Sequence, residues 1–229
     1  MSEQPLTPDH ASTSPARVRS FVRRGRFSDL TRERMASLAP ARALPAGPFD
    51  PVATFGRDAP VVLEIGCGHG QAALAYASAF PEHDIVAMDV HVPGLARMLA
   101  DTEQAGVPNL RIEVGDAVEL LVDRVPDATF AAVHLFFPDP WHKQKHTKRR
   151  FVSPTNLDLL ARVLRPGGHV LVATDQDFYA RHVLEEVASH PRFEASRTGR
   201  PAWRPADGFE AKGVAAGRTI SELRLEVLP

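Results

Sequence analysis

Short apolar runs alternate with amphipathic segments from about residue 60 to the end of the chain. The first apolar run, residues 61–65, is typical of a strand that is buried on both faces in a parallel sheet. Further apolar or alternating runs predict strands over 85–90, 110–114, 129–137, 169–174, 192–197 and 219–227. Apolar stripes at helical spacing, bounded by proline and glycine, predict helices over 71–80, 93–105, 117–122, 154–164 and 178–189.

Strand–helix alternation of this length predicts an α/β fold, in which a doubly wound sheet of seven mostly parallel strands carries helices on both faces. The first 57 residues do not share the alternation, because they are rich in Pro, Ala and Arg and have weak periodicity. We expect a basic, partly disordered N-terminal arm over 1–57, with one short helix near 29–38. The regular domain is then expected over 58–229.

Composition is that of a soluble globular protein, with 229 residues of which 44% are hydrophobic and 24% are charged. No apolar run approaches the ~20 residues that span a bilayer. Residues 1–20 also lack the apolar core of a signal peptide. Cys67 is the only cysteine, which excludes an internal disulfide and a zinc site of several thiolates. We therefore expect a cytoplasmic protein that does not associate with membranes.

The formal net charge of −1 argues against a nucleic-acid binder, but the basic residues are concentrated in two segments. Residues 17–34 hold seven arginines and two acids, and residues 141–150 hold five lysines or arginines and no acid. Two such segments on one face can hold a polyanion. Two separate solvated charge runs would give the same pattern, so the sequence leaves both interpretations open at this point.

A glycine-rich turn follows the first predicted strand, in the order Glu64-Ile-Gly66-Cys-Gly68-His-Gly70. Glycine at every second position lets the backbone adopt positive φ cheaply and pass close to a ligand. A dinucleotide fingerprint GxGxxG would need glycine at position 71, where Gln71 stands. Glu64 favours a cationic ligand over phosphates, and adenosylmethionine carries an ammonium and a sulfonium. A tight structural turn and a nucleoside or nicotinamide site are the alternatives.

Two further acids follow predicted strands. Asp89 ends the second strand, where a carboxylate can hold two ribose hydroxyls. Asp116 follows the third strand, near where an adenine amino group would lie. Because open α/β sheets bind ligands beyond the carboxyl ends of their strands, we expect Glu64, Asp89 and Asp116 around one donor site.

The fourth predicted strand ends near Asp139, which lies between two prolines that restrict its backbone. In a doubly wound fold this position faces the methyl group of the donor, although a turn acid that accepts backbone hydrogen bonds is the alternative. Trp141 is either a core residue or a stacking platform for a base. A metal site from His142 and His146 is not expected, because no carboxylates stand at matching spacing. The basic run 143–150 follows at once and can anchor phosphates while a base enters the pocket.

Four segments carry a resemblance to a known family: LEIGCGHG (63–70), MDVHVPG (88–94), FFPDPWHKQKHTKRR (136–150) and ATDQDFY (173–179). Together they resemble the bacterial tRNA (guanine-N7-)-methyltransferase family, TrmB. The segment RSFVRRGR (19–26) resembles that family's N-terminal arginine segment, and the match runs in order from about Arg19 to Glu210. PDPWHK followed by KRR is its most distinctive signature.

The resemblance implies a class I, Rossmann-like methyltransferase fold that ends in an antiparallel hairpin. It also implies S-adenosylmethionine as the methyl donor and the guanosine at position 46 of the tRNA variable loop as the target. By position, Glu64, Asp89 and Asp116 match the family's donor-binding acids.

The resemblance extends to the substrate side of the site. Asp139 matches the family's active-site aspartate, and Lys143 and Asp175 match its substrate-contacting residues. The sequence also departs from the family's pattern. Asp89 stands where the family often has glutamate, and aspartate, although shorter, can still bind a ribose. His69 replaces a common methionine, which we expect to be tolerated.

A third departure lies near the C-terminus. The family's Thr-Lys-Phe-Glu substrate motif is DGFE (207–210) in this chain. Phe209 and Glu210 carry over, whereas Asp207 and Gly208 do not match.

These observations predict a methyltransferase that makes 7-methylguanosine in tRNA, with tRNA as its partner and without a metal. A class I methyltransferase that acts on a different RNA or a small molecule is the main alternative, and a tRNA-binding module without donor affinity is another. We expect no obligate protein partner and a monomer or weak dimer. The predicted site residues are Asp139 as the catalytic group, Glu64, Gly66, Gly68, Gly70, Asp89 and Asp116 for the donor, and Lys143, Lys148, Arg149, Arg150, Asp175, Phe209 and Glu210 for the substrate.

Overall fold

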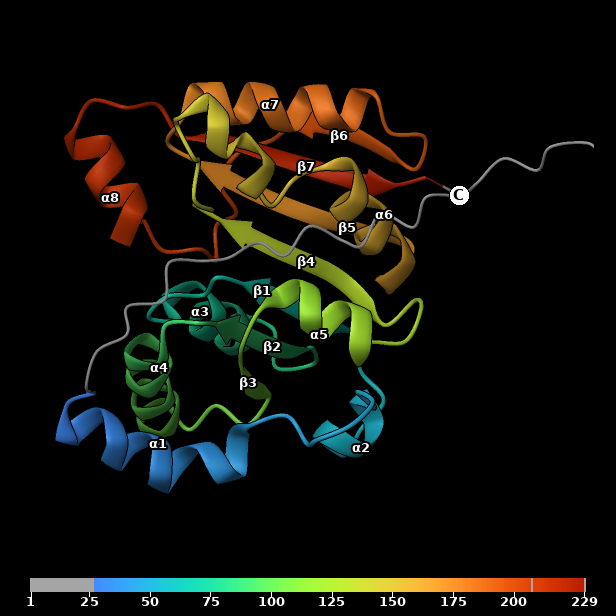
Figure 1. The fold of residues 1–229 in the computed structure, drawn as a ribbon. Coiled ribbons are helices and arrows are strands. Elements are labelled where there is room, and N and C mark those ends of the chain that lie inside the picture. The colour runs from blue at the N-terminus through green and yellow to red at the C-terminus, as the bar shows by residue number, and fades with distance from the viewer. Residues whose placement is uncertain (1–26, 207, 229) are drawn as a thin grey trace, which may run out of the picture.

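Seven strands form the central sheet of the computed structural model, which describes residues 27–206 and 208–228 (Figure 1). The strand order is β3-β2-β1-β4-β5-β7-β6. The first five strands in the chain are parallel, and β7 runs antiparallel to both β5 and β6. The predicted doubly wound, mostly parallel sheet is therefore confirmed. The strands are β1 (Val61–Ile65), β2 (Asp84–Asp89), β3 (Leu110–Val114), β4 (Phe130–Phe136), β5 (Leu164–Thr174), β6 (Phe193–Arg197) and β7 (Ser221–Val227).

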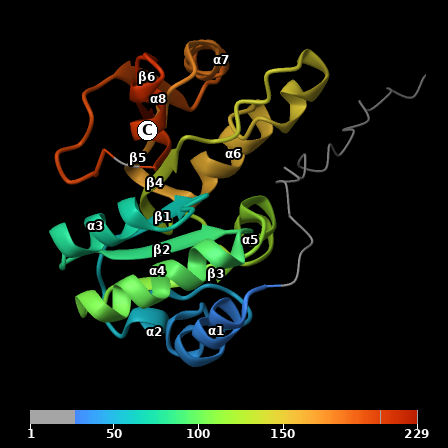
Figure 2. The same cartoon turned by 90° about the vertical axis from the view of Figure 1, so that its left-hand side faces the viewer.

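Helices cover both faces of this sheet, as Figures 1 and 2 show. Helices α3 and α4 pack on one face, and α5, α6 and α7 pack on the other. Among the described residues, no helix is long and apolar enough to cross a bilayer. The helices are α1 (Asp29–Arg42), α2 (Pro51–Phe55), α3 (Gln71–Ala79), α4 (Val92–Ala105), α5 (Ala117–Asp123), α6 (Pro154–Val163), α7 (Asp177–Ala188), α8 (Gly208–Ala215) and the 3-10 helix η1 (Gln144–Arg149).

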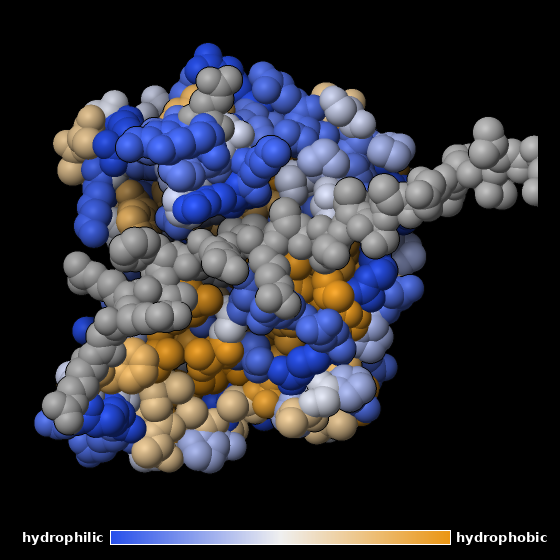
Figure 3. Space-filling view, viewed as in Figure 1, coloured by the Kyte–Doolittle hydropathy of each residue, from blue (hydrophilic) through white to orange (hydrophobic). Residues whose placement is uncertain are grey.

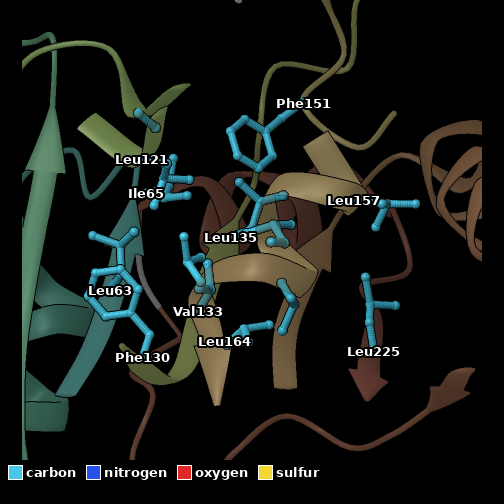
Figure 4. Close-up of a cluster of buried hydrophobic side chains, with 14 of the residues drawn as sticks. Leu63, Ile65, Leu121, Phe130, Val133, Leu135, Phe151, Leu157, Leu164 and Leu225 are labelled. Carbon is cyan, nitrogen blue, oxygen red and sulfur yellow. The ribbon is translucent and has the colours of Figure 1, made fainter. Parts of the chain in front are cut away.

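The apolar core lies on both faces of the sheet because successive residues of a strand point to opposite sides. In β1, Leu63 and Ile65 join a large cluster with α5, α6 and α7, whereas Val62 joins a smaller cluster with α3 and α4. Figure 4 shows part of the large cluster, with the ring of Phe151 next to Leu135. Burial on both faces explains why β1 is a nearly continuous apolar run.

Part of the predicted N-terminal arm is described, and it packs on the sheet domain. Helix α1 lies along α4, and Ala43 pairs with Ile112 of β3 in a parallel bridge. The Arg42 guanidinium donates to the carbonyl oxygen of Val107 at 2.6 Å. The boundary between arm and domain at residue 57 stays a prediction. The arginine segment 19–26 lies outside the described residues.

Several elements differ from the sequence-based expectation in extent. β5 starts at Leu164 rather than at 169, because Leu164 already pairs with Phe130 before the register of β4 and β5 shifts. Helix α1 continues past Pro40 to Arg42. The short helices α2, η1 and α8 were not predicted. α2 and η1 span only five and six residues, and α8 lacks a clear apolar stripe, so none of them produces a strong periodic signal.

Candidate active site

A pocket opens where the carboxyl ends of the parallel strands meet. It is lined by Ile65 at the end of β1, Gly66 directly after it, Asp89 at the end of β2 and Asp116 after β3. The ring of Phe151, which is 7% exposed, forms part of its wall. Ligands of open α/β sheets bind at this edge, so the position agrees with that expected of a donor site. Phe151 was not predicted as a site residue, because a single apolar residue after a basic run carries no local signal of a pocket.

The glycine turn approaches this pocket with its backbone exposed. Gly66, Gly68 and Gly70 all have positive φ, of 73°, 58° and 75°. A Cβ added at Gly66 or Gly68 would meet no atom within 4 Å, so that a ligand can lie directly against the backbone there. A Cβ at Gly70 would instead lie 1.9 Å from Sδ of Met98 in α4. Gly70 therefore serves the packing of α3 on α4, and Gly66 and Gly68 leave space for a ligand.

Gly94 packs closely against the glycine turn. A Cβ at this position would lie 2.1 Å from the carbonyl oxygen of Gly68, so only glycine fits there without displacing the turn. We expect Gly94→Ala to weaken donor binding by about tenfold or more, since overpacking costs about 1–3 kcal/mol and must displace the turn. Isothermal titration with S-adenosylhomocysteine measures this effect. Gly199→Ala is the matched control, because a Cβ there meets no atom within 4 Å. Equal affinities for the two variants would contradict the support role of Gly94.

Asp89 ties the glycine turn to β2 while keeping its capacity to bind a ligand. One carboxylate oxygen accepts a hydrogen bond from the Gly68 amide at 2.7 Å, and the other accepts from the His91 amide at 2.8 Å. A carboxylate offers about four acceptor sites, so two remain for hydroxyl donors. Asp116 caps α5 by accepting from the Val118 amide at 2.8 Å, and it likewise retains acceptor capacity towards the pocket.

Glu64 lies beneath the turn rather than among the residues that line the pocket. Its side chain is 4% exposed, and one carboxylate oxygen is 3.7 Å from Nδ1 of His134. Burial and the nearby charge of Arg204 lower the pKa of His134 to about 3, so that imidazole is neutral. Burial, followed by the charges of Glu64 and Asp89, raises the pKa of the Cys67 thiol. Glu64 is therefore buried next to His134, and its direct contact with the donor stays a prediction.

Asp139 is exposed, just beyond the end of β4. Partial burial and the charge of Asp89 raise its pKa above the ordinary value of 3.8. The second cause places Asp139 within electrostatic range of Asp89, although Asp139 is not one of the residues that line the pocket. The structure thus brings Asp89 and Asp139 to one edge, where they attract a cation and repel phosphates. This arrangement suits a donor that carries a positive charge on its sulfur.

The basic segment after β4 is folded into η1 and presents most of its charges to solvent. Lys143, Lys145, Lys148 and Arg149 are exposed. The face shown in Figure 3 is mostly hydrophilic in its upper part, where α7 and the segment after β4 lie in Figure 1. Arg150 differs, because its Nε donates to the carbonyl oxygen of Pro140 at 3.0 Å. The basic residues predicted to bind the substrate are therefore of two kinds: exposed side chains, and the partly buried Arg150, which contacts the protein backbone.

The remaining predicted substrate residues lie around α8. Asp175 follows β5 and accepts a hydrogen bond from Nε of Arg218 at 2.7 Å. Phe209 is 65% exposed, whereas Glu210 is 5% exposed. The Glu210 carboxylate pairs with Arg204 at 2.8 Å and with Arg200 at 3.4 Å. Phe209 is thus available to a substrate, and Glu210 is engaged inside the protein.

Arg204 was not predicted, although it organises this region. It is 3% exposed and forms ion pairs with both Glu210 and Glu222 of β7. Its guanidinium lies 4.8 Å from the ring centroid of Phe136 and 5.5 Å from that of Phe137. Burial raises the pKa of Glu222 to about 7, with Glu210 adding to the rise and Arg204 opposing it. The network joins α8 to the end of β4, next to Asp139.

This strand order, with a glycine turn and acids at the tips of β2, β3 and β4, defines a class I, S-adenosylmethionine-dependent methyltransferase. Residues 58–223 match the profile of a protein family described as "Putative methyltransferase". The tRNA (guanine-N(7)-)-methyltransferase of Alcanivorax borkumensis is 42% identical over 218 residues, which are 92% of this chain and 91% of the relative. That of Sodalis glossinidius is 42% identical over 233 residues, which are 97% of this chain and 98% of the relative. The chain therefore belongs to the tRNA (guanine-N(7)-)-methyltransferase family.

Solved structures with a similar fold are more distant in sequence. The 16S rRNA methyltransferase KamB has a TM-score of 0.55 at 17% identity, and the match covers 82% of this chain and 99% of that chain. An rRNA methylase from Streptococcus thermophilus has a TM-score of 0.51 at 15% identity, covering 90% of this chain and 100% of that chain. At these identities the likeness concerns the fold. Among the described residues, no group of three or more His, Cys, Asp or Glu side chains is arranged to hold a metal ion.

Proposed function

We propose that this protein transfers a methyl group from S-adenosylmethionine to N7 of a tRNA guanosine, at position 46 of the variable loop. The observation that carries the proposal is the pocket at the carboxyl ends of the parallel strands, lined by Asp89 and Asp116, with Asp139 and a segment of exposed lysines and arginines just beyond the end of the neighbouring strand β4. The family supplies the reaction class, since its relatives are tRNA (guanine-N(7)-)-methyltransferases over nearly their whole length.

The pocket residues match the parts of the donor by their chemistry. Asp89 would hold the ribose hydroxyls, and Asp116 would accept from the adenine amino group. The backbone of Gly66 and Gly68 leaves room for the donor against the turn, and Phe151 forms an apolar wall for the adenine ring. S-adenosylmethionine, when bound, supplies the methyl group on a positively charged sulfur. The negative potential of the acids favours such a cation at this edge.

The reaction mainly requires that the guanine base be positioned correctly relative to the methyl donor. Guanine N7 has an in-plane lone pair and carries no hydrogen, so no general base is needed before attack. The protein must place N7 in line with the methyl carbon and the departing sulfur. Positive charge develops on the guanine ring, and Asp139 would stabilise it by accepting a hydrogen bond from the N1–H or amino edge. Asp175, at the end of β5, would support the base from the neighbouring strand.

The exposed charges would hold the tRNA backbone. Lys143, Lys145, Lys148 and Arg149 would contact phosphates, and the exposed ring of Phe209 offers a stacking surface. Because a tertiary contact normally occupies N7 of this guanosine, some local opening of the variable loop accompanies binding. We place this activity in the cytoplasm, with a monomer or weak dimer that needs no protein partner.

Salt dependence tests the phosphate grip. Four phosphate contacts are expected to lower tRNA affinity roughly 50- to 150-fold between 50 and 200 mM salt, because each contact releases condensed counterions. Filter binding at several salt concentrations gives the slope of log K against log salt. Lys148→Met should reduce that slope by about 0.7 to 0.9. A flat response of the wild-type protein would contradict the assignment of the basic segment.

Mapping of the product tests the reaction itself. We expect purified protein and labelled donor to place the label on N7 of one guanosine in a tRNA transcript, and a transcript with adenosine at position 46 to stay unlabelled. A methyltransferase for another RNA would instead label ribosomal RNA more strongly than tRNA. Label on a different atom or nucleotide of tRNA would refute the proposed specificity.

A further inference from the structure

The segment around Asp139 has an unusual backbone conformation. Phe137 and Trp141 both have positive φ, of 51° and 47°. Among the described residues, Ala128 is the only other residue besides glycine with this property. Non-glycine residues adopt positive φ only when their surroundings impose it, and such positions cluster at functional sites. The conformation that presents Asp139 therefore depends on contacts that hold the segment at both ends.

The first end is held by the sheet. The amide of Phe137 donates to the carbonyl oxygen of Ala173 in β5 at 2.7 Å. Beyond this point the backbone offers few donors, because Pro138 and Pro140 have no N–H group. The backbone that follows Asp139 can therefore be held by a hydrogen bond to one of its carbonyl oxygens.

Arg150 provides that second attachment. Its Nε donates to the carbonyl oxygen of Pro140 at 3.0 Å, and its guanidinium lies 5.4 Å from the ring centroid of Phe178. Phe178 itself packs against the large core cluster. The next residue, Phe151, is buried and lines the donor pocket. Arg150 thus stands between a fixed wall of the donor pocket and the backbone of the Asp139 segment.

We propose that Arg150 is a positioning residue, which fixes the 138–141 backbone so that the Asp139 carboxylate faces the donor. It acts through the carbonyl oxygen of Pro140 and not as a phosphate contact, in contrast to the exposed Lys148 in the same basic run. This inference rests on the proposed function, since it assigns Arg150 to the same reaction as Asp139. It also changes the role that the sequence pattern predicts for Arg150.

The test compares Arg150→Met with Lys148→Met, because each removes one positive charge from the same segment. Single-turnover methylation at saturating tRNA and donor gives the rate, and filter binding gives the tRNA Kd. Arg150→Met is expected to lower the rate at least tenfold with a tRNA Kd within about twofold of wild type. Lys148→Met is expected to raise the Kd severalfold. Arg150→Lys should recover part of the rate, because an ammonium can donate to Pro140 but lacks the planar guanidinium.

The outcomes separate the two proposals. A wild-type protein that leaves tRNA unmethylated refutes the proposed function. If the wild-type protein methylates tRNA normally but Arg150→Met raises the tRNA Kd at an unchanged rate, only the positioning role is refuted. The same holds if Arg150→Met changes neither quantity. Thermal melting and titration with S-adenosylhomocysteine check that each variant is folded. Should Arg150→Met fail to fold, Arg150→Ala serves in the same comparison, and a rate equal to that of wild type would overturn the role.

Discussion

Asp139→Ala is expected to abolish methyl transfer while tRNA binding and donor binding remain close to wild type. Asp139→Asn, which keeps the shape and removes the charge, should lower the single-turnover rate by about 100- to 1000-fold, as is usual when one preorganised electrostatic group is lost. The physical reason is that positive charge moves from sulfur to the guanine ring during transfer. A carboxylate next to that ring stabilises the transition state more than the ground state.

The pH dependence of the rate gives a second readout of Asp139. Only the ionised carboxylate stabilises the developing cation, so the wild-type rate should fall as pH drops through the pKa of Asp139. That pKa is raised above 3.8 by partial burial and by Asp89, so the acid limb should lie above the ordinary range. The limb should disappear in Asp139→Asn. Asp127→Asn, whose site precedes β4 at the opposite edge of the sheet, is the control and should leave rate and pH profile unchanged. Wild-type turnover by Asp139→Ala would remove this residue from the mechanism.

Arg204→Met is expected to produce the largest loss of stability. Arg204 is 3% exposed between Glu210 and Glu222, which are 5% and 8% exposed. Removing one partner from a buried ionic network leaves uncompensated charge and costs about 3–5 kcal/mol of unfolding free energy. Urea denaturation measures the loss. Arg181→Met, which breaks an exposed pair with Asp177 within α7, should cost about 0.3–0.5 kcal/mol.

The loss in Arg204→Met should also depend on pH. The folded state raises the pKa of Glu222 from 4.5 to about 7, so its protonated form contributes stability that is full below pH 4.5 and is lost as pH rises through about 7. Arg204 compensates the ionised form, and its removal therefore matters most at high pH. The deficit should be larger at pH 8 than at pH 5.5. A deficit below 1 kcal/mol at pH 8 would show that the network does not stabilise this region.

The sequence was sufficient for the parts of the site that follow from local pattern. Apolar runs alternating with helical stripes predicted the parallel sheet, and acids at the ends of those runs predicted which strand tips carry polar groups. Asp89 and Asp116 could be found in this way, because the carboxyl ends of parallel strands always lie at one edge. The hydrogen bond that Asp116 accepts from Val118 follows locally, because Asp116 is the N-cap of α5, whereas the bond that Asp89 accepts from Gly68 depends on the fold.

Other features depended on contacts between distant segments. Arg204 stands in an irregular loop, and its partners in α8 and β7 carry no sequence signal that pairs them with it. Arg150 looks like its basic neighbours in the sequence, and only the fold directs it towards Pro140. Glu64 is an instructive intermediate case. Alternation along β1 places its side chain opposite to that of Ile65, which lines the pocket, so its burial near His134 could have been anticipated from strand geometry.

A crystal structure with bound S-adenosylhomocysteine is the most direct test of the claim that acids from separate strand tips surround the methyl donor. We expect the ribose hydroxyls on Asp89, the adenine beside Asp116 and Phe151, and the sulfur turned towards Asp139. A ligand bound away from the carboxyl ends of β1 to β4 would contradict the account. So would an Asp139 carboxylate that points away from the sulfur.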